Sequence, residues 1–451
     1  MPVVLQGPAR PQPAARRFPS LAVDRSAPWA HNRPIVRPWP HRERRIRRKG
    51  CPMKRRDTHR QGWKVALVLA MVAAALAGCQ KAEEVKDYAR PLPPGELALR
   101  KITDPDQIPE MTIACMELDR LREAIDNSLS YLSKPSSQQF FPYGQITHAD
   151  AVASLETMGT LLDQGFIGRR LESRIRELFD VYMSVGCDDA GTVLFTGYYT
   201  PIFDGSMKET GRFRYPLYKK PDDLVKNDLG EILGQVQPDG TYRPYPTRSE
   251  LENSTALKGL ELVWLADPFE VYIAHVQGSA KIRLPDGKLV TVAYDANNGH
   301  EYRSIAKKLV EDGKIPADRL SLQAMINYFR TRPHEVPRYT QANPRFVFFR
   351  IEEGDPRGSL NEPVIAYRTI ATDKDVYPRA CLAFLDAPLP RRIAGHVANR
   401  PYTGFVLDQD TGGAIRAPGR CDVYMGVGDE AGEMAGTVYT EGWLYYLFLK
   451  K

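Results

Sequence analysis

Alternation of apolar and polar residues from Gly191 onward limits the fold of this chain more than any other feature of the sequence. The pattern predicts β-strands within four segments, 192–201, 270–295, 345–351 and 404–410. In the second segment, Asp286-Gly287 separates two alternating runs, which predicts a hairpin turn. Helical patterns at 300–313 and 321–332 are short, and neither a βαβ alternation nor a GxxxxGK nucleotide loop is present. The sequence therefore predicts a mixed α+β fold that is mainly β.

The region before these strands has a different character, and we expect residues 111–190 to be helical. Apolar residues recur at helical spacing in two groups, Leu118, Leu121, Ile125, Leu129 and Leu132, and then Leu171, Ile175, Leu178, Phe179 and Tyr182. A chain of 451 residues exceeds the size at which one hydrophobic core stops growing. Two domains with non-globular ends are therefore expected.

The N-terminal part has the pattern of an export signal over residues 53–78. Cationic residues precede an apolar run from Val65 to Ala77, which is shorter than the ~20 residues that span a bilayer. Leu76-Ala77-Gly78-Cys79 resembles the lipobox of bacterial lipoproteins, which predicts lipidation at Cys79; the alternative is a soluble export signal with an incidental cysteine. Residues 1–52 are rich in Pro and Arg and are interpreted as a non-native or disordered extension, and residues 79–110 as a polar tether.

The charge distribution argues against nucleic acid as a partner. The whole chain carries a formal net charge of +7, but the basic excess lies within residues 1–78, so the remainder is acidic. Affinity for phosphate backbones comes chiefly from clustered Lys and Arg. An exported protein with an acidic mature part is therefore not expected to bind DNA or RNA.

Neither a metal site nor a cofactor is predicted. Beyond Cys79, no two cysteines have metal-ligand spacing, and HExxH and GxSxG motifs are absent. In an oxidising compartment the cysteines could form up to two disulfides, and separate burial of each thiol is the equally weighted alternative. The cysteines concerned are Cys115, Cys187, Cys381 and Cys421.

Carboxylates remain as candidates for the chemistry, and the segment with the strongest functional pattern runs from Asp410 to Gly436. It reads DTGGAIRAPGRCDVYMGVGDEAGEMAG and combines Asp410 and Asp422 with many glycines. Glycine permits close backbone approach and positive φ, which suits loops that press against a ligand. An ordinary turn-rich connection is the alternative interpretation.

Several motifs in order resemble the family of membrane-bound lytic murein transglycosylase A. They include FTGYYTP (195–201), QGSAKIRLPDG (277–287), NGHEYRSI (298–305), NPRFVFFR (343–350) and the DTGGAI and DVYMGVGDEAG sequences. The resemblance implies a double-psi β-barrel built from two separated chain segments, a smaller inserted β-domain, and a groove between them. Barrel entry strands and the inserted domain would occupy 191–345, and the C-terminal barrel half 346–451. Arg416-Ala417 stands where the family usually has Lys-Gly.

The resemblance also assigns three characteristic aspartates to Asp373, Asp410 and Asp422, with Asp422 as the single catalytic acid/base. A carboxyl that protonates a glycosidic oxygen near neutral pH needs a raised pKa, which burial supplies when no nearby cation compensates. Asp410 and Asp373 are expected to orient Asp422 or the glycine-rich loops, with structural turn caps as the alternative. Residues expected to contact the glycan are Tyr198, Tyr199, Thr200, Gln277, Gly278, Ser279, Gly412 and Gly413.

The implied function is cleavage of the bond between N-acetylmuramic acid and N-acetylglucosamine in peptidoglycan without water, which leaves 1,6-anhydro ends. A hydrolytic glycosidase of the same fold is one alternative, since ordinary glycosidases use a second carboxylate. A non-catalytic lipoprotein that binds glycan is another. The expected location is the periplasmic face of the outer membrane, through a lipid at Cys79, with peptidoglycan strands as partner and proteins of wall synthesis or division as further candidates.

Overall fold

The computed structural model describes residues 86–227 and 230–451. The extension, the signal segment and Cys79 lie outside the described residues. The described chain contains two large sheets and a small three-stranded one. Buried apolar side chains form one large cluster with the first sheet and smaller clusters in the part of the chain between 203 and 349.

Six strands close into a barrel in the order β17–β14–β15–β13–β16–β3, because β3 also pairs with β17. The pairs β16/β3 and β13/β15 are parallel, and the other pairs in the ring are antiparallel. Closure leaves these strands without a free edge. The strands are β3 (Val193–Thr200), β13 (Thr369–Ala371), β14 (Leu382–Ile393), β15 (His396–Asp410), β16 (Arg420–Val427) and β17 (Tyr439–Leu449).

The barrel is built from two chain segments, since β3 comes before residue 201 and the other five strands come after residue 368. The intervening chain forms a second six-stranded sheet in the order β12–β11–β10–β4–β9–β5. Its strands are β4 (Ile202–Ser206), β5 (Tyr215–Tyr218), β9 (Glu261–Leu265), β10 (Ser279–Arg283), β11 (Leu289–Asn297) and β12 (Val347–Glu352). The predicted mixed, mainly β fold with a separately inserted β part is confirmed. Because β12 pairs with β11, residues 347–352 complete the inserted sheet, although the sequence grouped them with the C-terminal barrel half.

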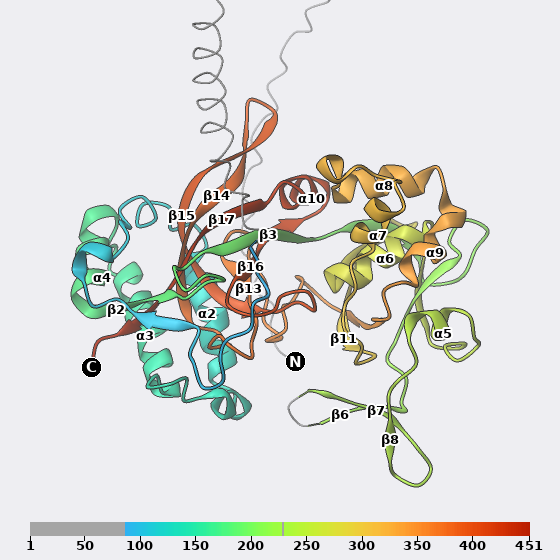
Figure 1. Ribbon diagram of the computed structural model, residues 1–451, viewed down its shortest axis with the longest axis horizontal. Coiled ribbons are helices and arrows are strands. Elements are labelled where there is room, and N and C mark those ends of the chain that lie inside the picture. The colour runs from blue at the N-terminus through green and yellow to red at the C-terminus, as the bar shows by residue number, and fades with distance from the viewer. Residues whose placement is uncertain (1–85, 228–229) are drawn as a thin grey trace, which may run out of the picture. The chain divides into compact units, whose positions relative to one another are not determined.

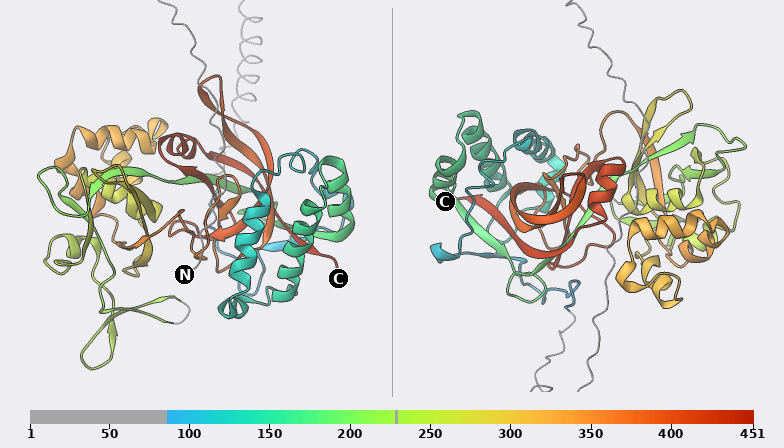
Figure 2. Two further views of the ribbon diagram at one scale, coloured as in Figure 1. Left: turned by 180° about the vertical axis from the view of Figure 1, so that it is seen from behind. Right: turned by 90° about the horizontal axis from the view of Figure 1, so that it is seen from above.

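Helices cover the two parts separately (Figures 1 and 2). Beside the barrel lie α2 (Leu121–Leu132), α3 (His148–Asp163), α4 (Gly168–Leu178) and α10 (Asp429–Ala435). The inserted part carries α5 (Arg248–Glu252), α6 (Pro268–Gln277), α7 (Ile305–Glu311), α8 (Leu322–Arg330) and α9 (Val336–Thr340). Short 3₁₀ turns occupy Pro105–Gln107, Pro135–Phe140, Ala317–Arg319 and Pro333–Glu335. The small third sheet consists of β6 (Leu224–Lys226), β7 (Ile232–Val236) and β8 (Tyr242–Arg243).

Two secondary-structure predictions were wrong in part. Residues 270–277 were assigned to a strand but form most of α6, because Asp267 caps its N-terminus, Pro268 occupies its first turn and Gly278 ends it with φ 77°. These capping signals outweigh the alternation of apolar residues. The helical pattern that was extended to Tyr182 ends at Leu178, where β2 (Phe179–Ser184) begins and pairs with β17.

The described part of the expected tether, residues 86–110, is held against the barrel-side part of the chain. The hydroxyl of Tyr88 donates to Glu441 Oε1 at 2.5 Å, and Arg90 forms an ion pair with Asp189 at 2.7 Å. Strand β1 (Leu99–Lys101) then pairs with β2. Backbone pairing of this kind is not compatible with a free tether over these residues.

The hairpin and most other predicted elements are present. Gly287 has φ 86° in the turn between β10 and β11, as the Asp286-Gly287 sequence predicted. The predicted strands at 345–351 and 404–410 correspond to β12 and the end of β15, and the helical patterns at 300–313 and 321–332 to α7 and α8.

Candidate active site

Strand pairing brings Asp410 and Asp422 to the same level of the barrel. Ala371, at the end of β13, pairs with Asp410 of β15 on one side and with Asp422 of β16 on the other. Residues paired across neighbouring strands point to the same face of a sheet. Asp373 follows two residues after Ala371. The structure therefore gathers the three predicted aspartates around the end of one short strand.

Asp422 has one oxygen engaged and one free among the described residues. Its Oδ1 accepts a hydrogen bond from the hydroxyl of Thr196, which pairs with it across β3 and β16. Arg420 Nε lies 3.4 Å from the same oxygen. No contact of Oδ2 is found within residues 86–227 and 230–451, and the side chain is 17% exposed. Within these described residues, the other carboxyl oxygens of Asp373, Asp410 and Asp422 all have a protein partner, and Oδ2 of Asp422 has none.

The condition attached to the predicted acid, that no cation lies beside it, is not met at Asp422. Arg420 stands two residues before Asp422 on the same strand, so both side chains leave the strand on one face. The pair is coulombic, since the Arg420 Nε group has no hydrogen-bond partner. Other nitrogens of Arg420 donate to Ala414 O at 3.0 Å and to Thr196 Oγ1 at 3.3 Å. Its guanidinium attracts the ionised form of the carboxyl.

Asp410 is fully engaged as an acceptor. Its Oδ1 accepts from the backbone N–H groups of Ser359 and Thr411, each at 2.8 Å, and its Oδ2 accepts from the hydroxyl of Tyr198 at 2.8 Å. Burial raises the pKa of Asp410, and these hydrogen bonds oppose that effect. Both oxygens are thus committed to holding neighbouring backbone and side-chain groups.

Asp373 fixes the loop between β15 and β16. Its Oδ2 accepts from the N–H of Ala417 at 2.7 Å, and its Oδ1 accepts from the N–H of Asp375 at 3.1 Å. Ala417 adopts φ 63°, a conformation unfavourable for a residue with a β-carbon. The hydrogen bond from Ala417 offsets part of this cost, so Asp373 holds the shape of the loop that runs from Thr411 to Gly419.

A buried ion pair between neighbours in sequence of the predicted aspartates was not predicted from the sequence. Lys374 binds the carboxylate of Asp408, and the two side chains are 5% and 0% exposed. Asp408 Oδ2 also accepts from Thr372 Oγ1 at 2.8 Å and from Tyr446 OH at 2.7 Å. The spacing of Asp408 and Asp410 on one strand is the only local signal that could have indicated it.

The predicted glycan-binding residues at the end of β3 are mostly engaged within the protein. The N–H of Tyr199 donates to Gln277 Oε1 at 3.1 Å, which links β3 to the end of α6. Thr200 Oγ1 lies 2.9 Å from Tyr424 OH and 3.3 Å from Ser279 Oγ. Tyr199, Thr200 and Ser279 are all buried. Burial raises the pKa of Tyr199 to about 12, so its hydroxyl stays protonated near neutral pH.

Tyr198 lies beside the aspartates. Its hydroxyl donates to Asp410, and its ring centroid is 5.1 Å from that of Tyr424. Burial raises its pKa well above the ordinary value. It is therefore a fixed donor that holds Asp410 Oδ2.

The predicted glycines have two separate roles. Gly278 ends α6 at φ 77°, so it turns the chain into β10. Gly413 lies against the inserted part, because a β-carbon there would be 3.0 Å from Arg345 Nε. Gly412 belongs to the same loop, where a β-carbon would contact Ile415. Gly412 and Gly413 thus stay close to the aspartates, whereas Gly278 acts through the backbone.

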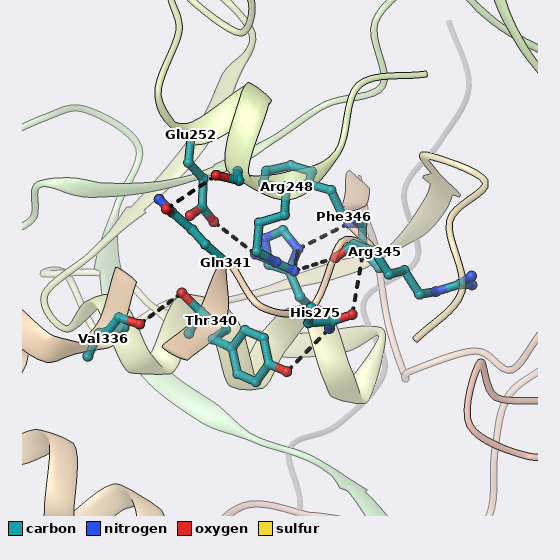
Figure 3. Close-up of polar contacts among 12 residues, drawn as sticks. Arg248, Glu252, His275, Val336, Thr340, Gln341, Arg345 and Phe346 are labelled. Carbon is teal, nitrogen blue, oxygen red and sulfur yellow. Dashed lines mark hydrogen bonds and ion pairs between the residues drawn. The ribbon is translucent and has the colours of Figure 1, made fainter. Parts of the chain in front are cut away.

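A buried cluster in the inserted part positions Arg345 (Figure 3). Arg248 is 1% exposed and donates to Arg345 O at 2.8 Å, to His275 Nδ1 at 3.2 Å and to Glu252 Oε1 at 3.0 Å. Burial lowers the pKa of His275 well below the ordinary value, so the ring is a neutral acceptor. Figure 3 shows the Arg345 side chain leaving this cluster, and its Nη1 donates to His300 O at 3.1 Å.

The described residues hold no group of three His, Cys, Asp or Glu side chains that could bind a metal ion. All four cysteines within this part of the chain are free and buried, which corresponds to the separate-burial alternative. Over 86–227 and 230–451, no helix has the length and apolar character required to cross a membrane.

Comparison with known proteins gives matches over both parts of the molecule. The MltA specific insert domain matches residues 194–350, and the 3D domain matches residues 368–448. The membrane-bound lytic murein transglycosylase A of Escherichia coli K12 is 30% identical over 260 residues, which cover 57% of this chain and 66% of that protein. The Vibrio cholerae protein of the same name is 29% identical over 255 residues, 56% of this chain and 64% of that protein. The match thus spans just under two thirds of these relatives.

Solved structures show the same fold. A membrane-bound lytic murein transglycosylase from Agrobacterium tumefaciens is 25% identical, with a TM-score of 0.65 over 78% of this chain and 98% of that chain. Escherichia coli MltA with bound chitohexaose has a TM-score of 0.61 at 24% identity, over 82% of this chain and 97% of that chain. The two matched domains together account for more than half of the 451 residues and follow the inserted sheet and the C-terminal barrel strands. The chain therefore belongs to the family of membrane-bound lytic murein transglycosylase A.

Proposed function

We propose that this protein is a lytic transglycosylase that cleaves the β-1,4 bond between N-acetylmuramic acid and N-acetylglucosamine in peptidoglycan. The observation that carries the proposal is that Oδ2 of Asp422 has no partner in the described part of the chain, whereas the oxygens of Asp410 and Asp373 all accept hydrogen bonds there. Relatives named lytic murein transglycosylases and an Escherichia coli MltA structure with bound chitohexaose support the substrate class.

Asp422 serves as the acid and then as the base. The protonated carboxyl donates its proton from Oδ2 to the glycosidic oxygen as the bond to C1 of the muramyl sugar breaks. The C6 hydroxyl of the same sugar then attacks C1, and the ionised carboxylate accepts its proton. Attack within one molecule has a high effective molarity, worth ~7–11 kcal/mol at best, so neither water nor a second carboxylate is needed. The product carries a 1,6-anhydro end, and the carboxyl is again protonated.

Arg420 acts in the second half of this cycle. At 3.4 Å from Oδ1, its guanidinium stabilises the carboxylate that forms once the proton has left. Thr196 fixes the orientation of Oδ1 throughout, so that Oδ2 faces the substrate.

The remaining predicted residues act around this carboxyl. We assign Asp410 and Asp373 to positioning, since each holds backbone N–H groups of the surrounding loops. The contact between β3 and the inserted part is formed by Tyr199, Thr200, Gln277, Gly278 and Ser279. The Gly412-Gly413 backbone and the edge of Tyr198 are assigned to glycan contact, because Tyr198 donates to Asp410 and the two glycines follow Asp410 in the loop.

We also propose that a lipid at Cys79 attaches the protein to the periplasmic face of the outer membrane. The lipobox-like sequence before Cys79 and the membrane-bound description of the relatives support this assignment. Acyl chains each add about 0.8 kcal/mol per buried CH₂, so several chains hold a protein without a spanning helix. Proteins of wall synthesis or division remain candidates for partners.

Digestion of purified peptidoglycan tests the proposed reaction. We expect fragments with 1,6-anhydro ends, one water lighter than hydrolytic fragments, when the products are identified by mass spectrometry. Asp422→Asn should lose at least a thousandfold in turnover with an unchanged melting temperature. Asp318→Asn, at an exposed aspartate in the inserted part, is the matched control and should cut like the parent.

Two outcomes would replace the proposal with its alternatives. Products that retain a free reducing end would indicate a hydrolytic glycosidase of the same fold. Glycan binding without cleavage by the parent protein would indicate a non-catalytic lipoprotein. Full activity of Asp422→Asn would assign the acid to another carboxyl.

A further inference from the structure

Three arginines surround the loop from Thr411 to Gly419. Arg420 donates to Ala414 O at 3.0 Å, Arg416 donates to Ile415 O at 3.1 Å, and the guanidinium of Arg345 lies against Gly413. Arg345 comes from the inserted part, whereas Arg416 and Arg420 come from the barrel segment. The positive charge therefore lies on both sides of the junction, and Arg420 also lies beside the carboxyl of Asp422.

Arg345 and Arg416 have no acidic partner within residues 86–227 and 230–451. Arg345 makes one side-chain hydrogen bond, from Nη1 to His300 O, and Arg416 makes one, from Nη1 to its neighbour Ile415. Burial lowers the pKa of Arg345, and the nearby charge of Arg416 lowers it further. A partly buried guanidinium with several unused donors beside a second cation is costly unless an anion binds there.

The backbone of Arg345 is held by buried partners. Its carbonyl accepts from buried Arg248, and its N–H donates to Asn343 Oδ1 at 3.2 Å. Asn343 is 2% exposed and also accepts from the N–H of Arg303 at 3.0 Å. Figure 3 shows the guanidinium of Arg345 extended away from the Arg248 and His275 side chains. A side chain whose backbone is held, and whose Nη1 already donates to His300 O, has less conformational freedom to lose on binding.

We propose that Arg345 and Arg416 bind a carboxylate carried by the muramyl residue of the glycan strand. The inference rests on the proposed function and narrows its substrate: the site would distinguish glycans with a muramyl carboxylate from neutral glucosamine polymers. A guanidinium presents a planar fork of donors that matches the two oxygens of a carboxylate. Asp422 is paired with Arg420, whereas Arg345 and Arg416 have no acidic partner among the described residues and remain available.

The carboxylate has two sources on a natural strand. The lactyl group of N-acetylmuramic acid carries a free carboxylate where the peptide has been removed. Where the peptide is present, the lactyl group forms an amide and the carboxylates belong to the stem peptide. The chemistry that the arginines recognise is the same, and the experiment separates the two sources.

Binding measured by calorimetry in the Asp422→Asn variant tests the proposal. The ligands are chitohexaose, which is neutral, a peptide-free muramyl glycan of similar length, and a glycan that retains its stem peptides. We expect Arg345→Gln and Arg416→Gln each to weaken binding of a muramyl glycan about tenfold and to leave chitohexaose within twofold. Arg345→Lys and Arg416→Lys keep the charge and should recover part of the loss. Arg400→Gln is the control, at an exposed arginine of the β14–β15 hairpin whose side chain has no hydrogen bond or ion pair within residues 86–227 and 230–451.

The pattern of loss identifies the source of the carboxylate. A loss with the peptide-free glycan assigns the lactyl group, and a loss confined to the peptide-bearing glycan assigns the stem. Equal losses for chitohexaose and both muramyl glycans, at an unchanged melting temperature, would overturn the proposal, as would no loss at all. If Asp422→Asn still cuts the glycans, the acid assignment fails instead, and the same comparison is then made from kcat/KM of the arginine variants.

Discussion

Glu270 in the first turn of α6 should make the stability of this protein depend on pH. Burial raises the pKa of Glu270 from 4.5 to about 7, and the charges of Asp267 and Asp204 add to the effect. No hydrogen bond or ion pair of its carboxyl is found in the described residues. Glu270→Gln removes the titration and keeps the shape of the side chain.

The direction of the pH dependence follows from the raised pKa of Glu270. Below about pH 4.5 the carboxyl is protonated in the folded and the unfolded chain, and the full stability is present. As pH rises toward 7, the unfolded chain ionises first, so the free energy of unfolding falls, and the loss is complete above the folded pKa. A change from 4.5 to about 7 corresponds to about 3 kcal/mol. Partial exposure of the side chain reduces our expectation to about 1–2 kcal/mol.

Thermal unfolding of parent and variant at several pH values measures this effect. Glu270→Gln should match the parent at pH 4 and melt at a higher temperature at pH 8, with the difference developing between those values. Glu301→Gln, at an exposed glutamate of the same inserted part, should follow the parent at every pH. Parallel curves for Glu270→Gln and the parent would refute the reasoning, because they would mean that Glu270 ionises normally in the folded state.

Three further changes test the surroundings of the proposed acid. Arg420→Gln removes the cation that lies 3.4 Å from Oδ1 of the proposed acid, so turnover of peptidoglycan should fall about tenfold at an unchanged melting temperature. Lys374→Met leaves Asp408 buried without its cation and should lower the free energy of unfolding by about 3–5 kcal/mol, measured by urea unfolding. Gly413→Ala places a β-carbon 3.0 Å from Arg345 Nε, so binding of muramyl glycans should weaken severalfold at an unchanged melting temperature.

Local sequence signals predicted most of the elements that surround the site. The turn at Asp286-Gly287 and the glycine-rich segment after Asp410 depend on residues close in sequence, which is where turn and loop chemistry is decided. The error at 270–277 arose because alternation was weighed without the caps: Asp267-Pro268 before the segment and Gly278 after it are both helix-end signals.

The neighbours of Asp422 could be predicted only in part. Arg420 precedes it by two residues, and a strand assignment alone places both side chains on one face, so this cation was accessible to sequence reasoning. The contact with Thr196 could not be predicted, because Thr196 lies 226 residues away in sequence and reaches Asp422 through a parallel strand pair. No local pattern specifies which strands of a closed barrel become neighbours.

That long-range pairing also ties the chemistry to the completion of the fold. Thr196 and Asp422 are brought together by the parallel pairing of β3 with β16, and β4 to β12 all lie between these two strands in sequence. The path of the chain from the inserted part back into the barrel also places Arg345 against Gly413. A partly folded chain that lacks the β3–β16 pairing therefore has neither the hydrogen bond to Asp422 nor the arginine beside the glycine-rich loop. The proposed glycan cutting should accordingly be lost in any variant that breaks the β3–β16 pairing, even where the inserted part stays folded.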